Sequence, residues 1–317
     1  MTISVVIPVF NSAAFVGEAL DSVLSQTVPV TQIIVVDDGS TDSTRRIVAG
    51  YPQVQWIGQK HQGASAARNS GIRRAQSELV AFMDSDDLWC LDKIEKQLTA
   101  FSLHPSAAFS FSTLASFYTR DNVVICNEPY MPKELRAWLD GKSIDEGGVF
   151  GNVYQLLLRA NCVLTSSVVA RRDALIEVGL FDESMRHGED QDLWLRLAHR
   201  WPALFITETI TKYRVHSSAL SGSWEKRQGL FFRSTVETLI KHRRMFPSFD
   251  ASKALAAMYN NYAMFQLKKR EFSEAKSLAG KGLCVVPTPT GLRLWLEAAF
   301  PRAYSYAVGL LRGGRAS

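Results

Sequence analysis

The chain has 317 residues, of which 46% are hydrophobic, and this length and composition predict a globular protein of roughly two domains. No apolar run approaches the ~18 residues that cross a bilayer, so the composition disfavours an integral membrane protein. The net charge of +5 is uneven, because residues 1–240 carry 23 Lys and Arg against 27 Asp and Glu, while residues 241–317 carry 13 against 4. The slightly acidic body argues against a nucleic-acid binder.

Strands and helices are expected to alternate through the first third of the chain. Apolar runs predict strands at 3–7, 32–36, 54–57 and 79–83, and helical spacing predicts helices at 12–25, 63–75 and 91–103. Ser12 is the expected cap of the first helix, and Ser40 or Thr41 is the expected cap of a helix after the second strand. This alternation indicates a mostly parallel sheet with right-handed crossovers.

The strand expected at 79–83 runs into three carboxylates, Asp84, Asp86 and Asp87. They follow the carboxyl end of a buried strand, where open α/β sheets place their ligands. Because like charges so close repel one another, a bound cation explains the group, and Mg²⁺ and Mn²⁺ prefer oxygen ligands that substrate phosphates complete. The alternative for one of the three is that Asp87 caps the helix that follows.

Four linked motifs give a more specific indication. They are Pro8-Val9-Phe10-Asn11, the segment from Val36 to Asp42, the segment from Gly63 to Asn69, and Asp84-Ser85-Asp86-Asp87. Their order and spacing resemble those of family 2 glycosyltransferases, which are inverting enzymes of the GT-A fold, over about residues 1–220. The resemblance implies a nucleotide-diphosphate sugar as donor and Mn²⁺ or Mg²⁺ as cofactor.

The resemblance also implies how the first motifs bind the donor. Pro8, Val9 and Phe10 match the segment that lines the base and the ribose, although Pro8 also serves to end a strand. Asp38 matches the carboxylate that accepts a hydrogen bond from a uracil-type base. The alternative is an aspartate that closes the turn before Gly39.

Charged residues around the diphosphate follow from the same resemblance. Arg68 matches an arginine near the diphosphate, where a permanent cation suits anionic oxygens, and the alternative is an exposed helix arginine. Asp86 matches the direct metal ligand, while Asp84 and Ser85 match positions at the sugar nucleotide, with Asp84 leaning towards the ribose. The division of metal binding between Asp84 and Asp86 stays open.

Between residues 106 and 171 the pattern loosens. Strands are expected at 107–117, 122–126 and 165–170, and residues 134–141 form a polar segment that ends in glycine. In similar enzymes this half of the domain builds the acceptor site. Its variability leaves the acceptor unidentified.

The segment from Phe181 to Trp194 matches the family's Glu-Asp pair at Glu189 and Asp190. The resemblance implies that Asp190 is the general base, with Glu189 as the second choice. An inverting transfer needs a carboxylate opposite the leaving group, to remove the proton of the attacking hydroxyl. An N-cap role for Asp190 is the alternative, and the two roles are compatible.

A further motif, Tyr213-Arg214-Val215-His216, follows a short expected strand. Strand alternation places Arg214 and His216 on the same face. Similar enzymes often carry this pattern with the histidine near the metal or the diphosphate, so His216 is a candidate third metal ligand. The alternative is a structural histidine.

Residues 223–317 are expected to be helical. Tyr259, Ala263, Phe272, Ala275 and Pro287 resemble a single tetratricopeptide-like hairpin with its turn at 268–270. One helical face is then expected to carry Leu292, Trp295, Leu296, Ala299 and Phe300. The same apolar spacing is repeated at Tyr304, Ala307, Val308 and Leu311. Four arginines lie near these apolar residues: Arg293, Arg302, Arg312 and Arg315. This basic amphipathic tail is expected either on an anionic membrane surface or packed on the enzyme or a dimer interface.

The sequence thus predicts a GT-A catalytic domain at 1–222, with a nucleotide-binding half at 1–105 and an acceptor half at 106–222, followed by a helical extension at 223–317. The expected activity is a metal-dependent, inverting, hexosyltransferase-type transfer, most readily from a UDP-sugar, to a hydroxyl of a glycan or lipid-linked glycan in surface polysaccharide synthesis. A sugar-nucleotide-forming nucleotidyltransferase is one alternative, although residues 8–12 lack the glycine and cations of a triphosphate-binding loop. A non-catalytic nucleotide-sugar-binding module is the other.

The cysteines favour a reducing compartment. All four, at 90, 126, 162 and 284, are widely spaced and form no metal-finger pattern, and no secretory signal is recognisable before the first strand. The expected location is the cytoplasm, or the inner face of the cytoplasmic membrane if the tail meets acidic headgroups. No nucleic-acid partner is expected, and the oligomeric state stays open.

Overall fold

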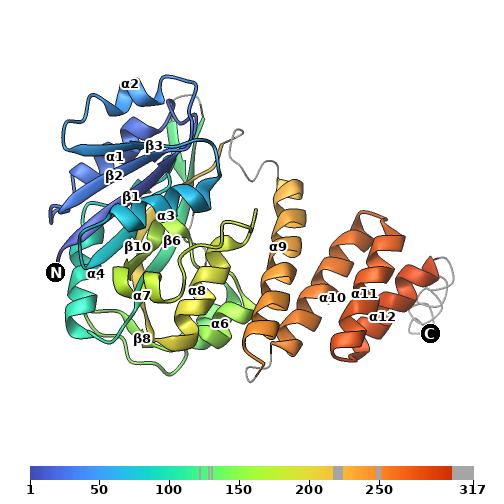
Figure 1. The fold of residues 1–317 in the computed structure, drawn as a ribbon. Coiled ribbons are helices and arrows are strands. Elements are labelled where there is room, and N and C mark those ends of the chain that lie inside the picture. The colour runs from blue at the N-terminus through green and yellow to red at the C-terminus, as the bar shows by residue number, and fades with distance from the viewer. Residues whose placement is uncertain (121–122, 128, 130, 217–223, 248–250, 302–317) are drawn as a thin grey trace. The chain divides into compact units, whose positions relative to one another are not determined.

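The computed structural model describes residues 1–120, 123–127, 129, 131–216, 224–247 and 251–301. The chain divides into two compact units, Met1–Ala219 and Leu220–Ser317, and each unit is described by itself (Figure 1). The first unit holds a mixed sheet with flanking helices. The second is helical in its described residues.

In the described part of the first unit, ten strands form one sheet. They are β1 (Ile3–Val9), β2 (Gln32–Asp37), β3 (Val54–Gly58), β4 (Leu79–Phe82), β5 (Leu88–Trp89), β6 (Phe109–Arg120), β7 (Val123–Cys126), β8 (Val149–Gly151), β9 (Val169–Arg171) and β10 (Ala203–Arg214). The order across the sheet is β3-β2-β1-β4-β9-β6-β10-β5, with β7 beside β6 and β8 beside β10.

The amino-terminal half of this sheet is parallel, as the alternation of strands and helices predicts. Strand β1 pairs in parallel with β2 and β4, and β2 pairs in parallel with β3. Beyond β4 the sheet becomes mixed, because β9 runs antiparallel to both β4 and β6, while β6 and β10 are parallel. Strands from residues 1–105 and strands from residues 106–214 therefore share one continuous sheet.

Eight helices and one 3-10 turn accompany the sheet in the described residues of this unit. They are α1 (Val16–Leu24), α2 (Thr44–Val48), α3 (Ala64–Arg74), α4 (Lys93–Leu103), α5 (Lys133–Leu139), α6 (Tyr154–Arg159), α7 (Arg172–Glu177), α8 (Glu189–Arg200) and the 3-10 turn η1 (Thr165–Ser167). Figure 1 shows them around the sheet, with α3 drawn across β1. The helices predicted at 12–25, 63–75 and 91–103 correspond to α1, α3 and α4.

Helices cover both faces of the central strands, whose side chains are buried. On one face, Val5 and Ile7 join apolar residues of α1 and α4 in a single core. On the other face, α3 lies so close to β1 that a Cβ atom added at Gly71 would come within 2.3 Å of Val6 Cγ1. Phe82, the β4 partner of Val6, packs there against Phe181 and against Trp194 of α8. Helices α3 and α8 therefore share that face.

Two predicted helix caps are wrong. The backbone carbonyl of Ser12 accepts hydrogen bonds from the amides of Phe15 and Val16, and its side chain does not cap α1. Helix α2 begins at Thr44 and is preceded by Ser43, so neither Ser40 nor Thr41 is its cap. Ser12 and Ser40 instead join loops that are distant in the sequence. Ser12 Oγ lies 2.8 Å from Ser85 Oγ, and Ser40 Oγ accepts from the Asn11 amide at 2.9 Å.

The segment from residue 106 to residue 171 also differs from its predicted elements. The strand predicted at 165–170 divides into the 3-10 turn η1 and the short strand β9, while residues 134–141 lie largely within α5. The strands predicted at 107–117 and 122–126 correspond to β6 and β7. Pairing partners distant in the sequence decide these boundaries, and periodicity alone does not reveal them.

The second unit has four helices in its described residues: α9 (Trp224–Met245), α10 (Ser252–Lys268), α11 (Phe272–Val285) and α12 (Pro289–Ala299). Helices α10 and α11 form the predicted hairpin, in which a Cβ atom at Gly282 would lie 3.3 Å from Tyr259 Cβ. Thr288 caps α12, because its Oγ1 accepts from the amide of Gly291 at 3.0 Å. The predicted continuation at Tyr304, Ala307, Val308 and Leu311 lies outside the described residues.

Candidate active site

The predicted site motifs meet at one edge of the sheet. Strands β1, β2 and β4 are parallel neighbours, with Val9 opposite Asp37 and Val6 opposite Phe82. Their carboxyl ends therefore lie together, and Phe10, Asp38 and Asp84 follow close behind those ends. This is the edge at which parallel α/β sheets bind ligands.

Asp38 is buried and fully engaged with the loop between β3 and α3. Its Oδ1 accepts from the Gln59 side-chain amide at 2.8 Å and from the Gln62 amide at 2.9 Å. Its Oδ2 accepts from the Gly63 amide at 2.8 Å and lies 2.9 Å from His61 Nδ1. Gly63 has a φ of 96°, which favours glycine. Asp38 thus anchors the loop between β3 and α3.

Phe10 and His61 form an exposed aromatic pair beside Asp38. Their ring centroids lie 4.3 Å apart, and Phe10 is 44% exposed. An accessible aromatic pair offers a stacking surface for a nucleobase. Val9 is only 2% exposed and belongs to the core, and Pro8 precedes it on β1, so of these three predicted residues Phe10 presents the largest side-chain surface.

Arg68 connects the two groups of carboxylates. Its guanidinium lies 2.7 Å from Asp84 Oδ1 and 3.2 Å from Glu189 Oε1, over the ring of Phe181. Only 8% of its side chain is exposed, so the alternative of an exposed helix arginine is wrong. Although burial favours the neutral form, Asp84 and Glu189 hold the pKa of Arg68 above its ordinary value. The cation therefore offsets part of the negative charge at the centre of the site.

Asp86 and His216 form the pair best suited to a metal ion. His216 Nε2 lies 3.0 Å from Asp86 Oδ2, and 30% of the Asp86 side chain is exposed. Asp84 points its Oδ1 to Arg68 instead, and no group of three His, Cys, Asp or Glu side chains in the described ranges is arranged to hold a metal ion. One carboxylate and one imidazole fit Mn²⁺ or Mg²⁺ if donor oxygens complete the shell. Ser85, the residue before Asp86 in the motif, forms a hydrogen bond through its Oγ with Ser12 Oγ at 2.8 Å.

Asp87 has a role that the sequence did not indicate. It is completely buried, and its oxygens accept from Ser166 Oγ at 2.5 Å and from the Arg214 amide at 3.0 Å. The helix-cap alternative is wrong, because α4 begins after Asp92. Burial and the neighbouring carboxylates raise the pKa of Asp87 well above its ordinary value. Asp87 therefore belongs to the support of the motif rather than to its exposed surface.

Arg214 fixes the same motif from β10. Its Nε donates to the carbonyl oxygen of Asp86 at 2.7 Å, and its guanidinium forms an ion pair with Glu18 of α1 at 2.7 Å. The predicted common placement of Arg214 and His216 thus brings both residues to Asp86, one to its backbone and one to its side chain. Neither Glu18 nor Ser166 carried a recognisable signal, because both lie far from Asp86 in the sequence.

Asp190 lies in the first turn of α8, beside Glu189. Gly188, with a φ of 77°, precedes the helix, so the N-cap alternative for Asp190 is wrong; its Oδ1 accepts from the Gln191 amide at 2.7 Å. Burial raises the pKa of Asp190 to about 7, and the charge of Glu189 adds to the rise. Charge interactions with Arg68 and Asp84 place Asp190 in the same site.

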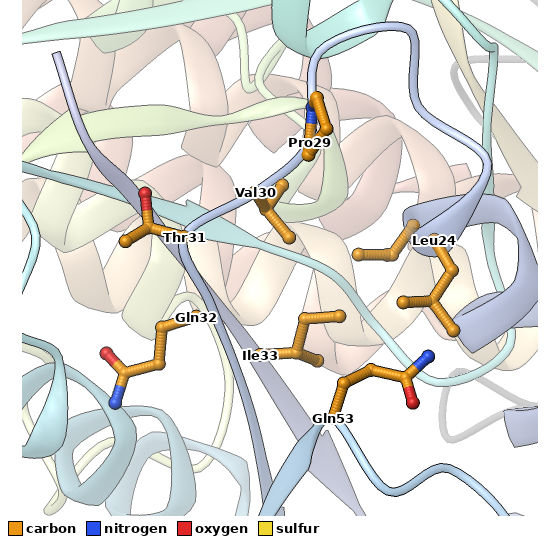
Figure 2. A pocket seen from close by; sticks show the side chains of 8 residues that line it. Leu24, Pro29, Val30, Thr31, Gln32, Ile33 and Gln53 are labelled. Carbon is orange, nitrogen blue, oxygen red and sulfur yellow. The ribbon is translucent and has the colours of Figure 1, made fainter.

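A small pocket elsewhere in this unit does not coincide with these residues. It measures about 140 Å³ and is lined by Val23, Leu24, Pro29, Val30, Thr31, Gln32, Ile33 and Gln53. Figure 2 shows these side chains around the beginning of β2, at the opposite end of that strand from Asp37. The candidate active site is therefore defined by its charged side chains rather than by this cavity.

Sequence comparisons relate the chain to known glycosyltransferases. Residues 4–152 match the family model described as "Glycosyl transferase family 2". The chain is 30% identical over 238 residues to a Bacillus subtilis protein named "Putative teichuronic acid biosynthesis glycosyltransferase TuaG", covering 73% of this chain and 86% of that protein. An uncharacterized glycosyltransferase of Rickettsia felis is 31% identical over 217 residues, covering 67% of this chain and 33% of the relative. The chain thus spans about a third of the length of the Rickettsia felis and Rickettsia conorii relatives.

Solved structures share the fold. S. aureus TarS 1–349 in complex with UDP-GlcNAc aligns with a TM-score of 0.63 at 17% identity, over 96% of this chain and 88% of that one. The mannosyltransferase PcManGT from Pyrobaculum calidifontis, in complex with GDP-Man and Mn²⁺, gives 0.56 at 17% identity, over 96% and 82%. These likenesses confirm the predicted GT-A fold. The family match and the relative TuaG, which is 30% identical and covered to 86% of its length, show that this chain belongs to glycosyl transferase family 2.

Proposed function

We propose that the enzyme is inverting and metal-dependent and transfers a sugar from a nucleotide-diphosphate donor, with Asp190 as the general base. The observation that carries this proposal is Arg68, which pairs with both Asp84 and Glu189. Since Glu189 is occupied by this ion pair, Asp190 is the carboxylate of the Glu-Asp pair that is better placed to accept a proton. Its raised pKa of about 7 matches that role near neutral pH.

The donor nucleotide is proposed to bind across the ends of β1 and β2. Phe10 and His61 supply a stacking surface for the base, and Asp38 lies directly behind His61. A UDP-sugar is the favoured donor, supported by the TarS structures with UDP and UDP-GlcNAc, while the GDP-Man complex of PcManGT keeps GDP-sugars as the next choice. Pro8, Val9 and Ser85 complete the proposed donor site.

Asp86 and His216 are proposed to hold the divalent ion, with Asp84 turned towards Arg68 and the ribose. Mn²⁺ bound there would neutralise the diphosphate as it leaves. Arg68 is positioned to add a second, permanent positive charge near the same oxygens. The Mn²⁺ in the PcManGT complex supports this part of the proposal.

The transfer step follows from this arrangement. Asp190 removes the proton of the acceptor hydroxyl, the hydroxyl oxygen forms a bond to the anomeric carbon, and the bond from that carbon to the diphosphate oxygen breaks. The nucleoside diphosphate leaves with the bond electrons, and the proton stays on Asp190 until solvent removes it. Attack opposite to the leaving group inverts the anomeric centre.

The acceptor is proposed to be a glycan or lipid-linked glycan in polysaccharide assembly at the cytoplasmic face of the membrane. The names of two relatives support this context: the teichuronic acid protein TuaG, and the Escherichia coli chondroitin synthase, which is 25% identical over 230 residues, 69% of this chain and 30% of the relative. Peripheral contact with anionic lipid is proposed for the basic helical unit. Among the helices of the described residues, none has the length and hydropathy of a membrane span.

Calorimetric binding of UDP, with and without Mn²⁺, tests the donor and metal parts together. We expect Mn²⁺ to strengthen UDP binding to the wild type. It should not strengthen UDP binding to Asp86→Ala, because this variant lacks the exposed carboxylate of the metal pair. Asp140→Ala, an exposed aspartate after α5, is the matched control and should bind as the wild type does. Metal-independent binding, or an unchanged effect of Mn²⁺ on UDP binding to Asp86→Ala, would contradict the assigned metal pair.

A further inference from the structure

The 3-10 turn η1 places a buried serine directly behind the metal motif. Ser166 is completely buried, and its hydroxyl has two partners, both within the segment from Asp84 to Asp87. Its Oγ accepts from the amide of Asp84 at 3.0 Å and donates to Asp87 Oδ2 at 2.5 Å. A hydroxyl has one proton and two acceptor sites, so this geometry uses the donor and one acceptor on the two ends of the motif.

We propose that Ser166 is a positioning residue for the metal site, acting through Asp84 and Asp87 to hold Asp86 in the orientation that binds the ion. The inference rests on the proposed metal-dependent function. Ser166 itself is not expected to touch the donor or the metal, because it is buried beneath the turn that carries Asp86.

The rest of the turn is fixed from the opposite side. Asp87 Oδ1 accepts from the Arg214 amide, and the Arg214 guanidinium holds the carbonyl of Asp86. The amide of Asp84, the carbonyl of Asp86 and both oxygens of Asp87 are thus hydrogen-bonded to buried groups. The Asp86 carboxylate remains 30% exposed. A rigid backbone that carries an accessible carboxylate is the arrangement that lowers the cost of ordering a metal ligand.

Ser166 is in turn held by the core. Trp89 Nε1 donates to the Ser166 carbonyl at 2.8 Å, so the position of the serine backbone does not depend on its own hydroxyl. Removing the hydroxyl should therefore leave η1 in place and release the motif. The Asp84 amide and the Asp87 carboxylate would each lose a buried partner, which favours a small movement of the turn towards water.

The adjacent serine provides a matched control. Ser167 belongs to the same 3-10 turn and is also completely buried, but its hydroxyl donates to the Leu164 carbonyl at 2.7 Å and not to the metal motif. Ser166→Ala and Ser167→Ala each remove one buried hydroxyl from neighbouring positions. A general effect of packing or stability would appear in both variants, whereas a positioning effect would appear in Ser166→Ala alone.

The test is calorimetric titration of Mn²⁺ into UDP-saturated full-length protein, with UDP binding in the absence of metal as the second readout. We expect the Mn²⁺ Kd of Ser166→Ala to rise roughly tenfold, the size typical for loss of a group that orients a metal ligand. The metal-free UDP Kd of that variant, and both constants of Ser167→Ala, should remain within about twofold of the wild type.

Other outcomes would overturn the proposal. An unchanged Mn²⁺ Kd in Ser166→Ala, or equal rises in both serine variants, would show that the hydroxyl does not position the ligand. If Ser166→Ala does not fold, Ser166→Cys keeps the size but weakens the hydrogen bonds, and the same rise is expected of it. A wild-type protein that binds UDP but no Mn²⁺ would overturn the proposed function as well, whereas normal wild-type binding with an unaffected variant would overturn the role of Ser166 alone.

Discussion

At the scale of single residues, the proposed chemistry depends on the protonation of Asp190. A general base works only when it is deprotonated, and burial together with Glu189 raises the pKa of Asp190 to about 7. We therefore predict that transferase activity, measured as kcat/KM, falls about tenfold for each unit of pH below 7 and levels off above it. If kcat/KM fell only below about pH 4, the base would be a carboxylate with an ordinary pKa instead.

Two variants separate Asp190 from its neighbour. Asp190→Asn should lower kcat by at least about 100-fold, the usual contribution of a general base. Glu189→Gln removes a negative charge that raises the pKa of Asp190. The activity of this variant should therefore still fall at acid pH, but the fall should begin at a lower pH than in the wild type. Full activity in Asp190→Asn, or loss of the fall at acid pH in Glu189→Gln, would transfer the role to Glu189.

The sequence indicated those candidate site residues that belong to compact motifs. Asp84, Asp86 and Arg68 were recognisable because their segments have a characteristic order and spacing, and the structure places all three at one edge of the sheet. His61 and Ser166 were not recognisable, because each contributes through a partner that folding brings close: Phe10 in one case, Asp87 in the other. Serine and histidine are too common in loops to indicate such pairings.

At the scale of secondary-structure elements, the position of α3 against β1 sets the position of Arg68. The two elements touch at Gly71, where an added Cβ would lie 2.3 Å from Val6 Cγ1. We predict that Gly71→Ala lowers the free energy of unfolding by about 1–3 kcal/mol, the range typical of overpacked cores. Transfer activity should fall as well, because the displaced helix carries Arg68 away from Asp84 and Glu189.

Urea unfolding measures the stability effect, and Gly17→Ala is its control. Gly17 also lies in a helix, but its added Cβ would meet the Tyr51 hydroxyl at 3.5 Å, an ordinary contact. Alanine is the better helix former by about 1 kcal/mol, so Gly17→Ala should be neutral or stabilising. Equal stability of the two variants would show that α3 adjusts freely against the strand.

Elements were predictable where local periodicity decides them. The parallel strands β1, β2 and β4 read as continuous apolar runs because helices bury both of their faces. The segment after β4 also contains antiparallel additions such as β9, three residues long between β4 and β6. So short a strand is stabilised by pairing with its neighbours rather than by its own sequence pattern. The sequence therefore predicted a single strand where the structure has a 3-10 turn followed by β9.

At the scale of the whole molecule, charge separates the two compact units. Residues 1–219 carry 20 Lys and Arg against 25 Asp and Glu, whereas residues 220–317 carry 16 against 6. The sequence therefore indicated a second unit of different character from its charge alone. Its helices follow from periodicity, but which of their apolar residues remain at the surface of the unit depends on packing and is visible only in the structure.

Helix α12 carries an apolar stripe on its surface. Leu292 and Leu296 of the helix and its C-cap Phe300 lie four residues apart and are 52%, 38% and 57% exposed, and the neighbouring Arg293 is exposed too. Side chains at this spacing share one helix face. An exposed apolar stripe on a strongly basic unit has the chemistry of an anionic membrane surface, where the cations meet headgroups and the apolar side chains enter the interface.

We predict that the full-length protein floats with vesicles containing phosphatidylglycerol and not with pure phosphatidylcholine vesicles. Serine substitutions at Leu292, Leu296 and Phe300 should abolish flotation, because they remove the apolar contact and leave the charge unchanged. The matched control replaces three exposed apolar residues of the acidic unit, Leu91, Ile144 and Ile176, by serine and should float as the wild type does. Equal flotation of both triple variants would exclude the α12 stripe as the lipid contact. A wild-type dimer in light scattering that dissociates in the α12 variant, without flotation, would assign the stripe to a second copy of the chain.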